Sequence, residues 1–144
     1  MAINTKTIRD AIATRIKQRL SLECEPFDVP SEIYPRAVVL HGQPFIEYHG
    51  TFGRGIATLN FEIEVRTNAA DDVSAQIALA KFVDDGTGQA SSIVAALEDP
   101  TPDLGGIVEN LHVIDVQMAP GQPLPNGGVE YIALFRVAVK ARRD

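Results

Sequence analysis

Five residues of the chain could form an acid–base or metal-binding constellation, because imidazole and carboxylate groups bind divalent metals and exchange protons. They are His41, Glu47, His49, His112 and Asp115. Glu47 and His49 are two positions apart and so project from one face of a strand, and His41 can approach them across a hairpin. Such a trio would make a small metal-dependent hydrolase. Because no metal-site spacing accompanies it, we expect surface or hydrogen-bonded histidines, with no metal and no catalytic residue.

The glycines in the stretch HGTFGRGIATLNFEIEV raise a second chemical possibility, a phosphate-binding loop. Such a loop follows a strand and opens a helix, because free N–H groups at the helix N-terminus hold the phosphate. Here Gly50, Gly53 and Gly55 precede an alternating, strand-like run, so we expect them to form the turn between two paired strands. Phe52 and Arg54 would then lie exposed at its tip.

The remaining reactive groups have simpler explanations. Cys24 is the single cysteine, so it can form no internal disulfide and no multi-thiolate metal site, and we expect a small buried filler. The acidic pairs at 71–72 and 84–85 fall at the ends of an expected helix, where capping explains them. The chain contains no Walker loop, G-x-S-x-G elbow or Cys/His pairing. We therefore expect neither a cofactor nor an enzymatic activity.

Three helices are expected around these residues. The first is capped by Asn4 or Thr5 and carries basic residues opposite an apolar stripe. That stripe consists of Ile8, Ala11, Ile12, Ile16 and Leu20. The second covers 68–85, with Asn68 or a nearby Asp as its cap. Its buried stripe is expected to be Val73, Ile77 and Ala80 with Ala78 or Lys81. A shorter helix covers 89–99, where prolines end it.

Five strand-like runs complete the pattern. Residues 36–40 and 44–49 are two short strands separated by the turn formers HGQP, and 57–67 alternates cleanly between apolar and polar residues. Residues 107–119 and 128–141 are two more strands, joined by a loop too long for a tight hairpin turn. The proline-broken stretch 21–36 is an extended connector.

This order predicts one α+β domain spanning residues 1–144. A mainly antiparallel sheet of four to five strands would carry the N-terminal helix and one or two further helices on one face. The length of 144 residues suits a single core.

Charge and hydropathy narrow the functional classes. The net charge is −6, and the few basic residues gather at the two ends of the chain, so the body is acidic and repels phosphate backbones. No window is apolar enough for a membrane span, and the N-terminus lacks the pattern of a secretory signal, so we expect an intracellular protein. Extended loops on a small sheet, with a final strand whose second face is not fully polar, favour a subunit that completes its burial against copies of itself.

Three segments resemble one protein family. They are FDVPSEIYPRAVVLHGQPFIEYHGTFGRGIATLNFEIEV, DPTPDLGGIVENLHVIDV and GGVEYIALFRVAVKA. In this order they resemble the tail terminator proteins of long-tailed (siphovirus-type) bacteriophages, particularly those that infect actinobacteria. The likeness extends from about Phe27 to Ala141. One departure is that Pro102 and Asp103 are inserted into a loop that usually reads Asp-Pro-Thr-Leu-Gly-Gly.

The resemblance implies a structural virion protein without enzymatic activity. It would form a homohexameric ring that caps the tail tube, stops its polymerisation and provides the head-attachment interface. Its partners would be itself, the tail tube protein and a head-completion or connector protein, while genomic DNA passes through the channel without specific binding. It would lie at the head–tail junction of the virion, and in the host cytoplasm during assembly.

Two loops are the expected contacts with neighbouring subunits or with the tube. They contain Thr51, Phe52 and Arg54 and, after the fourth strand, Gln122, Pro123 and Leu124. Two alternatives stay open. The first is a head-completion or neck protein at the same junction, and the second is the metal-dependent hydrolase built on His41, Glu47 and His49.

Overall fold

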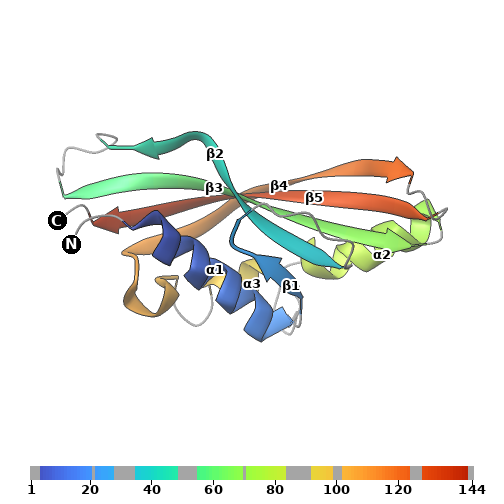
Figure 1. The fold of residues 1–144 in the computed structure, drawn as a ribbon, viewed down its shortest axis with the longest axis horizontal. Coiled ribbons are helices and arrows are strands. Elements are labelled where there is room, and N and C mark those ends of the chain that lie inside the picture. The colour runs from blue at the N-terminus through green and yellow to red at the C-terminus, as the bar shows by residue number, and fades with distance from the viewer. Residues whose placement is uncertain are drawn as a thin grey trace.

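The computed structural model describes residues 4–20, 22–27, 35–48, 55–69, 71–83, 92–98, 102–123 and 128–142. The elements, in chain order, are α1 (Thr5–Leu20), β1 (Glu23–Glu25), β2 (Arg36–Glu47), β3 (Ile56–Ala69), α2 (Asp72–Val83), α3 (Ile93–Glu98), a 3₁₀ turn at Leu104–Gly106, β4 (Asn110–Pro123) and β5 (Val129–Arg142). Figure 1 shows one long, twisted sheet with the helices beneath it: α1 and α3 under one half and α2 under the other. The predicted α+β class is confirmed.

The sheet has five strands in the order β1-β2-β3-β5-β4. Only β1 and β2 are parallel, and the other three pairs are antiparallel. The centre is formed by β3 and β5, which pair without interruption from Ile56 opposite Arg142 to Ala69 opposite Val129. Their alternation is the one expected from sequence, because every second side chain faces the helices and is buried there. The rings of Phe61 and Phe135 lie in this core.

β2 is one strand, so the prediction of two short strands separated by a turn was wrong. His41 pairs with Phe61 and Ile46 with Leu59, so five steps along β2 match two along β3 and the extra residues bulge out. The amide Nδ2 of Asn60 donates a 2.8 Å hydrogen bond to the Pro44 carbonyl inside the bulge. The sequence HGQP therefore bends a strand instead of ending it, because the continuous β3 holds both halves.

Two further expectations about strands were wrong. The connector 21–36 contains β1, whose three residues pair in parallel with Arg36, Ala37 and Val38. The fourth strand, expected at 107–119, begins later and continues through the predicted loop, since β4 ends at Pro123, which pairs with Val129. Neither feature produces a local sequence signal, because both depend on a partner strand distant in sequence.

Helix α1 begins as expected, since the Asn4 side chain accepts a 3.1 Å hydrogen bond from the Thr7 N–H. Ile8, Ile12 and Ile16 are buried against the sheet. Arg9 was expected on the basic outer side, but it is 8% exposed and lies inside. The inward face of α1 is therefore wider than the predicted stripe.

Helix α2 is rotated relative to the prediction. Its buried residues are Ala75, Leu79 and Phe82, whereas Val73 and Ile77 are exposed. Asn68 belongs to β3, and the cap is Asp71, whose carboxylate accepts a 2.8 Å bond from the Ser74 N–H. The orientation is fixed by the core and by the Thr67 hydroxyl, which donates to the Ala75 carbonyl.

Helix α3 is shorter than the expected 89–99. It follows Ser92, whose hydroxyl accepts from the Ala95 N–H, and it ends at Glu98. Residues 84–91 and 99–101 lie outside the described part of the chain.

Candidate functional site

Most of the residues predicted as subunit or tube contacts lie outside the described ranges. Thr51, Phe52, Arg54 and Leu124 lie outside the described residues. Gln122 and Pro123 form the end of β4 by their backbone, and their side chains are not described. The strand ends that carry the two loops are nevertheless placed.

These strand ends lie at opposite ends of the sheet. The loop after β2 enters β3 at Ile56, opposite Arg142, whereas the loop after β4 enters β5 at Val129, opposite Ala69. The 14 residues of β3 separate the two ends by about 43 Å at about 3.3 Å per residue. The strand ends that carry the two loops are therefore far apart on one subunit.

The predicted acid–base and metal set is dispersed. His41 pairs with Phe61 and so projects toward the helices, whereas Glu47 pairs with Thr58 and projects from the opposite face. Glu47 accepts a bond from Asn60 there, and His49 lies outside the described residues. His112 is paired with Glu98 at 3.6 Å. Nowhere in the described ranges do three His, Cys, Asp or Glu side chains come together in a metal-binding arrangement.

Cys24 is buried in β1, as expected for a filler. Burial first, and then the negative charge of Glu25, raise the pKa of its thiol to about 12. Since the thiolate is the reactive form, this thiol has little nucleophilic character near neutral pH.

The described strands leave two sheet edges open. β4 is the last strand in the order, so the outer edge of Asn110–Pro123 has no strand partner among the described residues. At the other side β1 covers only the first three residues of β2, so the outer edge of 40–47 likewise has no strand partner among the described residues. Such edges are natural sites for pairing with another chain.

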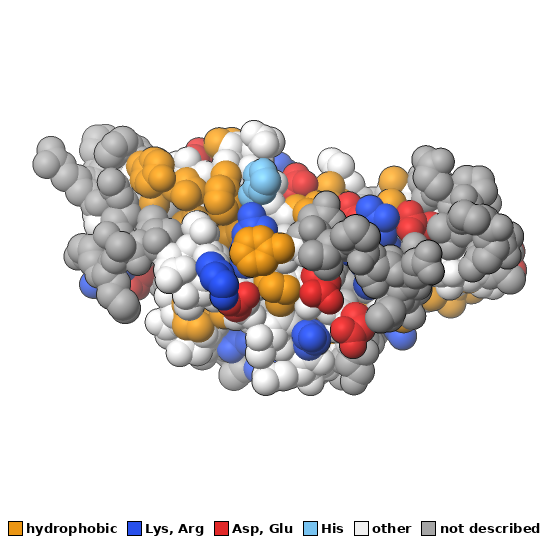
Figure 2. Space-filling view, viewed as in Figure 1, with side chains coloured by type: hydrophobic (Ala, Val, Ile, Leu, Met, Phe, Trp, Pro, Cys, Tyr) orange, Lys and Arg blue, Asp and Glu red, His pale blue; other side chains and the backbone are white. Residues whose placement is uncertain are grey.

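The two edges differ in their side chains. The β4 edge has a bulge between Val113 and Asp115, beside which Ile114 is 54% exposed, and Met118 is 44% exposed further along. At the β2 edge Phe45 and Ile46 are partly buried and Tyr48 is exposed. Figure 2 shows hydrophobic side chains gathered over this end of β2, beside a histidine.

A buried guanidinium organises the β2 edge. Arg9 donates to the carbonyls of Val39 at 3.2 Å and Pro26 at 3.3 Å, and it meets His41 Nδ1 at 3.4 Å. Its guanidinium also lies 4.8 Å from the centre of the Phe27 ring and 5.7 Å from that of Phe45. Burial lowers the pKa of Arg9, although a guanidinium stays charged at any ordinary pH. Arg9 thus fixes the residues after β1 and the β2 bulge to α1.

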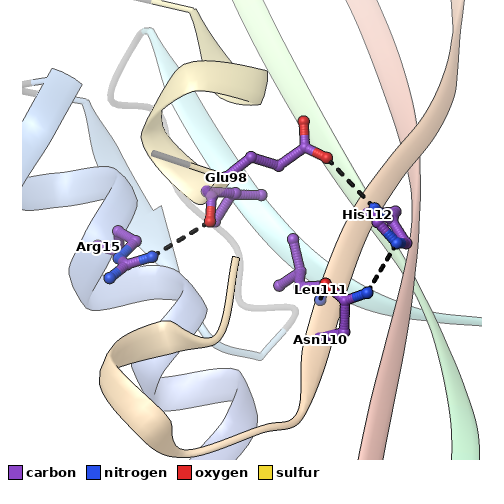
Figure 3. Close-up of polar contacts among 6 residues, drawn as sticks. Arg15, Glu98, Asn110, Leu111 and His112 are labelled. Atoms are coloured by element: carbon purple, nitrogen blue, oxygen red, sulfur yellow. Dashed lines mark hydrogen bonds and ion pairs between the residues drawn. The ribbon is translucent and has the colours of Figure 1, made fainter. Parts of the chain in front are cut away.

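A second polar network positions the start of the β4 edge (Figure 3). Arg15 of α1 donates to the Leu97 carbonyl in the last turn of α3, a group that has no partner within its own helix. The next residue, Glu98, pairs with His112 of β4, which also contacts the Asn110 amide at 2.9 Å. The edge is therefore held by helices on the covered side of the sheet.

The helix-free face of the sheet carries paired charges. Arg136 holds Asp115 through two hydrogen bonds, one of them 2.8 Å from Nε to Oδ1. These bonds lower the pKa of Asp115 and raise that of Arg136. Arg66 lies between Glu64 and Glu130, 3.5 Å from the latter. Because these charges largely compensate one another, the described part of this face offers no concentrated cationic surface.

Sequence reasoning missed two pairs of exposed apolar residues and one buried arginine. Ile114 and Met118 were placed in a strand, but nothing indicated that this strand would be an edge. The exposed pair on α2, Val73 and Ile77, was assigned to the core because two apolar stripes are present on that helix. Arg9 could have been found, since it is three and seven positions before Ile12 and Ile16 and therefore shares their side of the helix.

No protein-family model matches the chain, and no curated protein does. No helix in the described part is both long and apolar enough to cross a membrane.

Proposed function

We propose that the chain is a tail terminator of a long-tailed bacteriophage. In this role, copies form a ring that caps the completed tail tube, stops its polymerisation and offers the surface to which the filled head attaches. The sequence resemblance suggests the role. The structural observation that supports it is the pair of unlike sheet edges, β4 on one side and the second half of β2 on the other, neither of which has an outer strand partner within the described ranges.

Unlike edges favour a ring over a two-fold dimer. A two-fold dimer uses one self-complementary patch, whereas a ring joins one patch to a different patch on the next copy and closes when the rotation allows. The β4 edge presents Ile114 and Met118, and the β2 edge presents Tyr48 beside Phe45 and Ile46. Two different apolar margins on one sheet meet that requirement. Six copies follow from the family resemblance.

The separation of the loops suits a protein that joins two structures. The strand ends that lead to the two predicted contact loops lie at the two ends of β3, about 43 Å apart at about 3.3 Å per residue. One of these loops contains Thr51, Phe52 and Arg54, and the other contains Gln122, Pro123 and Leu124. One loop can therefore contact the tube while the other contacts a neighbouring subunit or the head-side connector.

Charge is compatible with DNA passing through such a ring. The chain has a net charge of −6, and several cations of the helix-free face are paired with carboxylates. DNA binding without sequence preference depends on Lys and Arg side chains that replace counterions on the phosphates. A surface whose cations are already neutralised lets the DNA slide.

Removing the gene from the phage tests the role. We expect tubes of abnormal, uncontrolled length without heads, measured by electron microscopy of lysates, and normal particles when the gene is supplied from a plasmid. Tails of normal length without heads, with the protein binding only the portal or its adaptor, would instead assign it to the neck. Normal, infectious particles in its absence would refute both roles.

A further inference from the structure

His41 lies beside a buried cation at the open part of the β2 edge. Its Nδ1 is 3.4 Å from Nη2 of Arg9, a residue that is 8% exposed. A guanidinium has N–H donors and no acceptor, so Nδ1 of His41 must accept this hydrogen bond and carry no proton. A protonated imidazole has donors at both nitrogens, so it would lose the bond and place a second positive charge against Arg9. The contact is therefore made by the neutral form of His41.

No acid on the elements packed around His41 compensates such a charge. The charged group that α1 presents to it is Arg9, and its partner on β3 is the apolar Phe61. Glu47, further along β2, projects from the opposite face, and the acids of β1 lie beside the start of β2. No ion pair joins His41 to an Asp or Glu in the described part of the chain. In the free chain His41 is exposed, so water screens the imidazole from Arg9.

The β4 edge is apolar on the side from which His41 projects. Its helix-facing residues, which pair with buried residues of β5, are Leu111, Val113, Val116 and Met118. The acids near this edge are engaged elsewhere, since Asp115 pairs with Arg136 on the helix-free face and Glu109 pairs with Arg142. Rotation about a ring axis keeps the same face of every copy inward, so the helix-facing sides of both edges meet at the seam. A β4 edge that joins β2 therefore excludes water from His41 and brings no carboxylate to it.

We infer that His41 makes the contact between copies depend on pH: the β4 edge of one copy binds the β2 edge of the next more tightly when the His41 imidazole is neutral. Covering the protonated form would bury two like charges next to each other without an acid, which costs free energy. Assembly is therefore weak in acid and strengthens as the pH rises through the range in which an exposed imidazole loses its proton. The inference rests on the contact between the two edges that the proposed function requires.

The size of the effect follows from proton linkage. A contact that excludes one proton loses up to about tenfold in its association constant for each pH unit below the titration of the free group. For an exposed imidazole, which titrates near pH 6.5, this gives roughly a tenfold loss per contact between about pH 7.5 and about pH 5.5. Asp71 and Asp115 have lowered pKa values and Cys24 has a pKa of about 12, so none of these three titrates in that window.

Two substitutions of His41 test the role of its charge. His41→Asn keeps an acceptor for Arg9 but does not titrate, whereas His41→Lys is positive throughout. By analytical ultracentrifugation we expect the wild type to associate roughly tenfold more weakly per contact at about pH 5.5 than at about pH 7.5, and His41→Asn to change less than about twofold. His41→Lys should associate weakly at both. Circular dichroism at each pH checks that the chains are folded.

The matched control is a second exposed histidine. His112 lies 3.6 Å from Glu98, which compensates its charge, so His112→Asn should keep the pH dependence of the wild type. Loss of the pH dependence in His112→Asn, or its persistence in His41→Asn, would overturn the inference. Wild-type rings that cap tubes and assemble equally well at both pH values would overturn it while leaving the proposed function in place. A wild-type chain that stays monomeric at every pH would overturn both.

Discussion

The most quantitative consequence of the fold concerns Arg9, a cation that lies beneath the β2 edge. Replacing Arg9 by Met keeps much of the side-chain length and its packing against the aromatic rings, but it removes the donors to the Val39 and Pro26 carbonyls. We expect the variant to fold with lower stability. The Val39 carbonyl then lies buried without this donor, whereas that of Pro26 is only partly buried.

The magnitude of the destabilisation is set by the hydrogen bonds and cation–π interactions of the guanidinium. Leaving a buried carbonyl unsatisfied costs about 1–3 kcal/mol, and the cation–π interactions add about 0.5–2 kcal/mol. Relief from burying a charge offsets part of this cost. A net destabilisation of about 2–3 kcal/mol corresponds to a fall in Tm of roughly 6–12 °C for a domain of this size.

Thermal and denaturant unfolding measure this effect, with Lys17→Met as the matched control. Lys17 is exposed and lies 3.9 Å from Glu23, so losing its charge should change stability by no more than about 0.5 kcal/mol. If Arg9→Met proved as stable as the wild type, the cost of burying the guanidinium would equal everything it contributes. The view that Arg9 holds the β2 edge in place would then be refuted.

Three other outcomes follow from single positions. Gly42→Ala should lower the free energy of unfolding in urea by about 1–3 kcal/mol, because its new Cβ would lie 3.1 Å from the Asn60 carbonyl oxygen. Gly55→Ala has open space around the new Cβ and should be neutral. Equal effects of the two substitutions on stability would contradict the close approach of the β2 bulge to β3. With a thiol pKa of about 12, Cys24 should react with a disulfide reagent at pH 8 only after denaturation, and rapid labelling of the native chain would contradict its burial. The pKa of Asp115 is lowered in the folded state, so its contribution to folding stability is present above about pH 4 and is lost as the pH falls through that lowered pKa. Asp115→Asn should therefore reduce the fall in Tm that acid causes. A Tm profile against pH that is the same as for the wild type would show that the Asp115–Arg136 ion pair is not formed.

Sequence reasoning succeeded where a pattern is local. β3 and β5 were found because their side chains alternate over more than ten residues. Helix α1 was found because a capping residue precedes it and its isoleucines recur with the helical period. The α+β class follows from the order of these elements. Local periodicity, however, does not say which apolar side of a helix faces the core.

The failures came from pairing and packing between distant segments. Val73 and Ile77 were placed in the core because α2 has two apolar stripes, and the choice between them depends on how β3 and β5 fit the helix. β1 was missed because its pairing partner lies more than ten residues away. The HGQP sequence was interpreted as a turn because its residue types are the same in turns and in bulges.

The candidate site was less accessible than the fold. Sequence placed partner contacts in loops, and Thr51, Phe52, Arg54 and Leu124 remain predictions because they lie outside the described residues. The open edges of β2 and β4 became visible only with the strand order. An edge is a property of the whole sheet, so no single strand sequence specifies it.

The most direct measurement is electron microscopy of purified protein mixed with isolated tail tubes. We expect rings in the protein alone and one ring at a single end of each tube, after which added tube subunits no longer extend that end. Protein that remains monomeric, leaves both tube ends bare and does not stop their elongation would contradict a role in which the chain acts by binding its own copies and the tube.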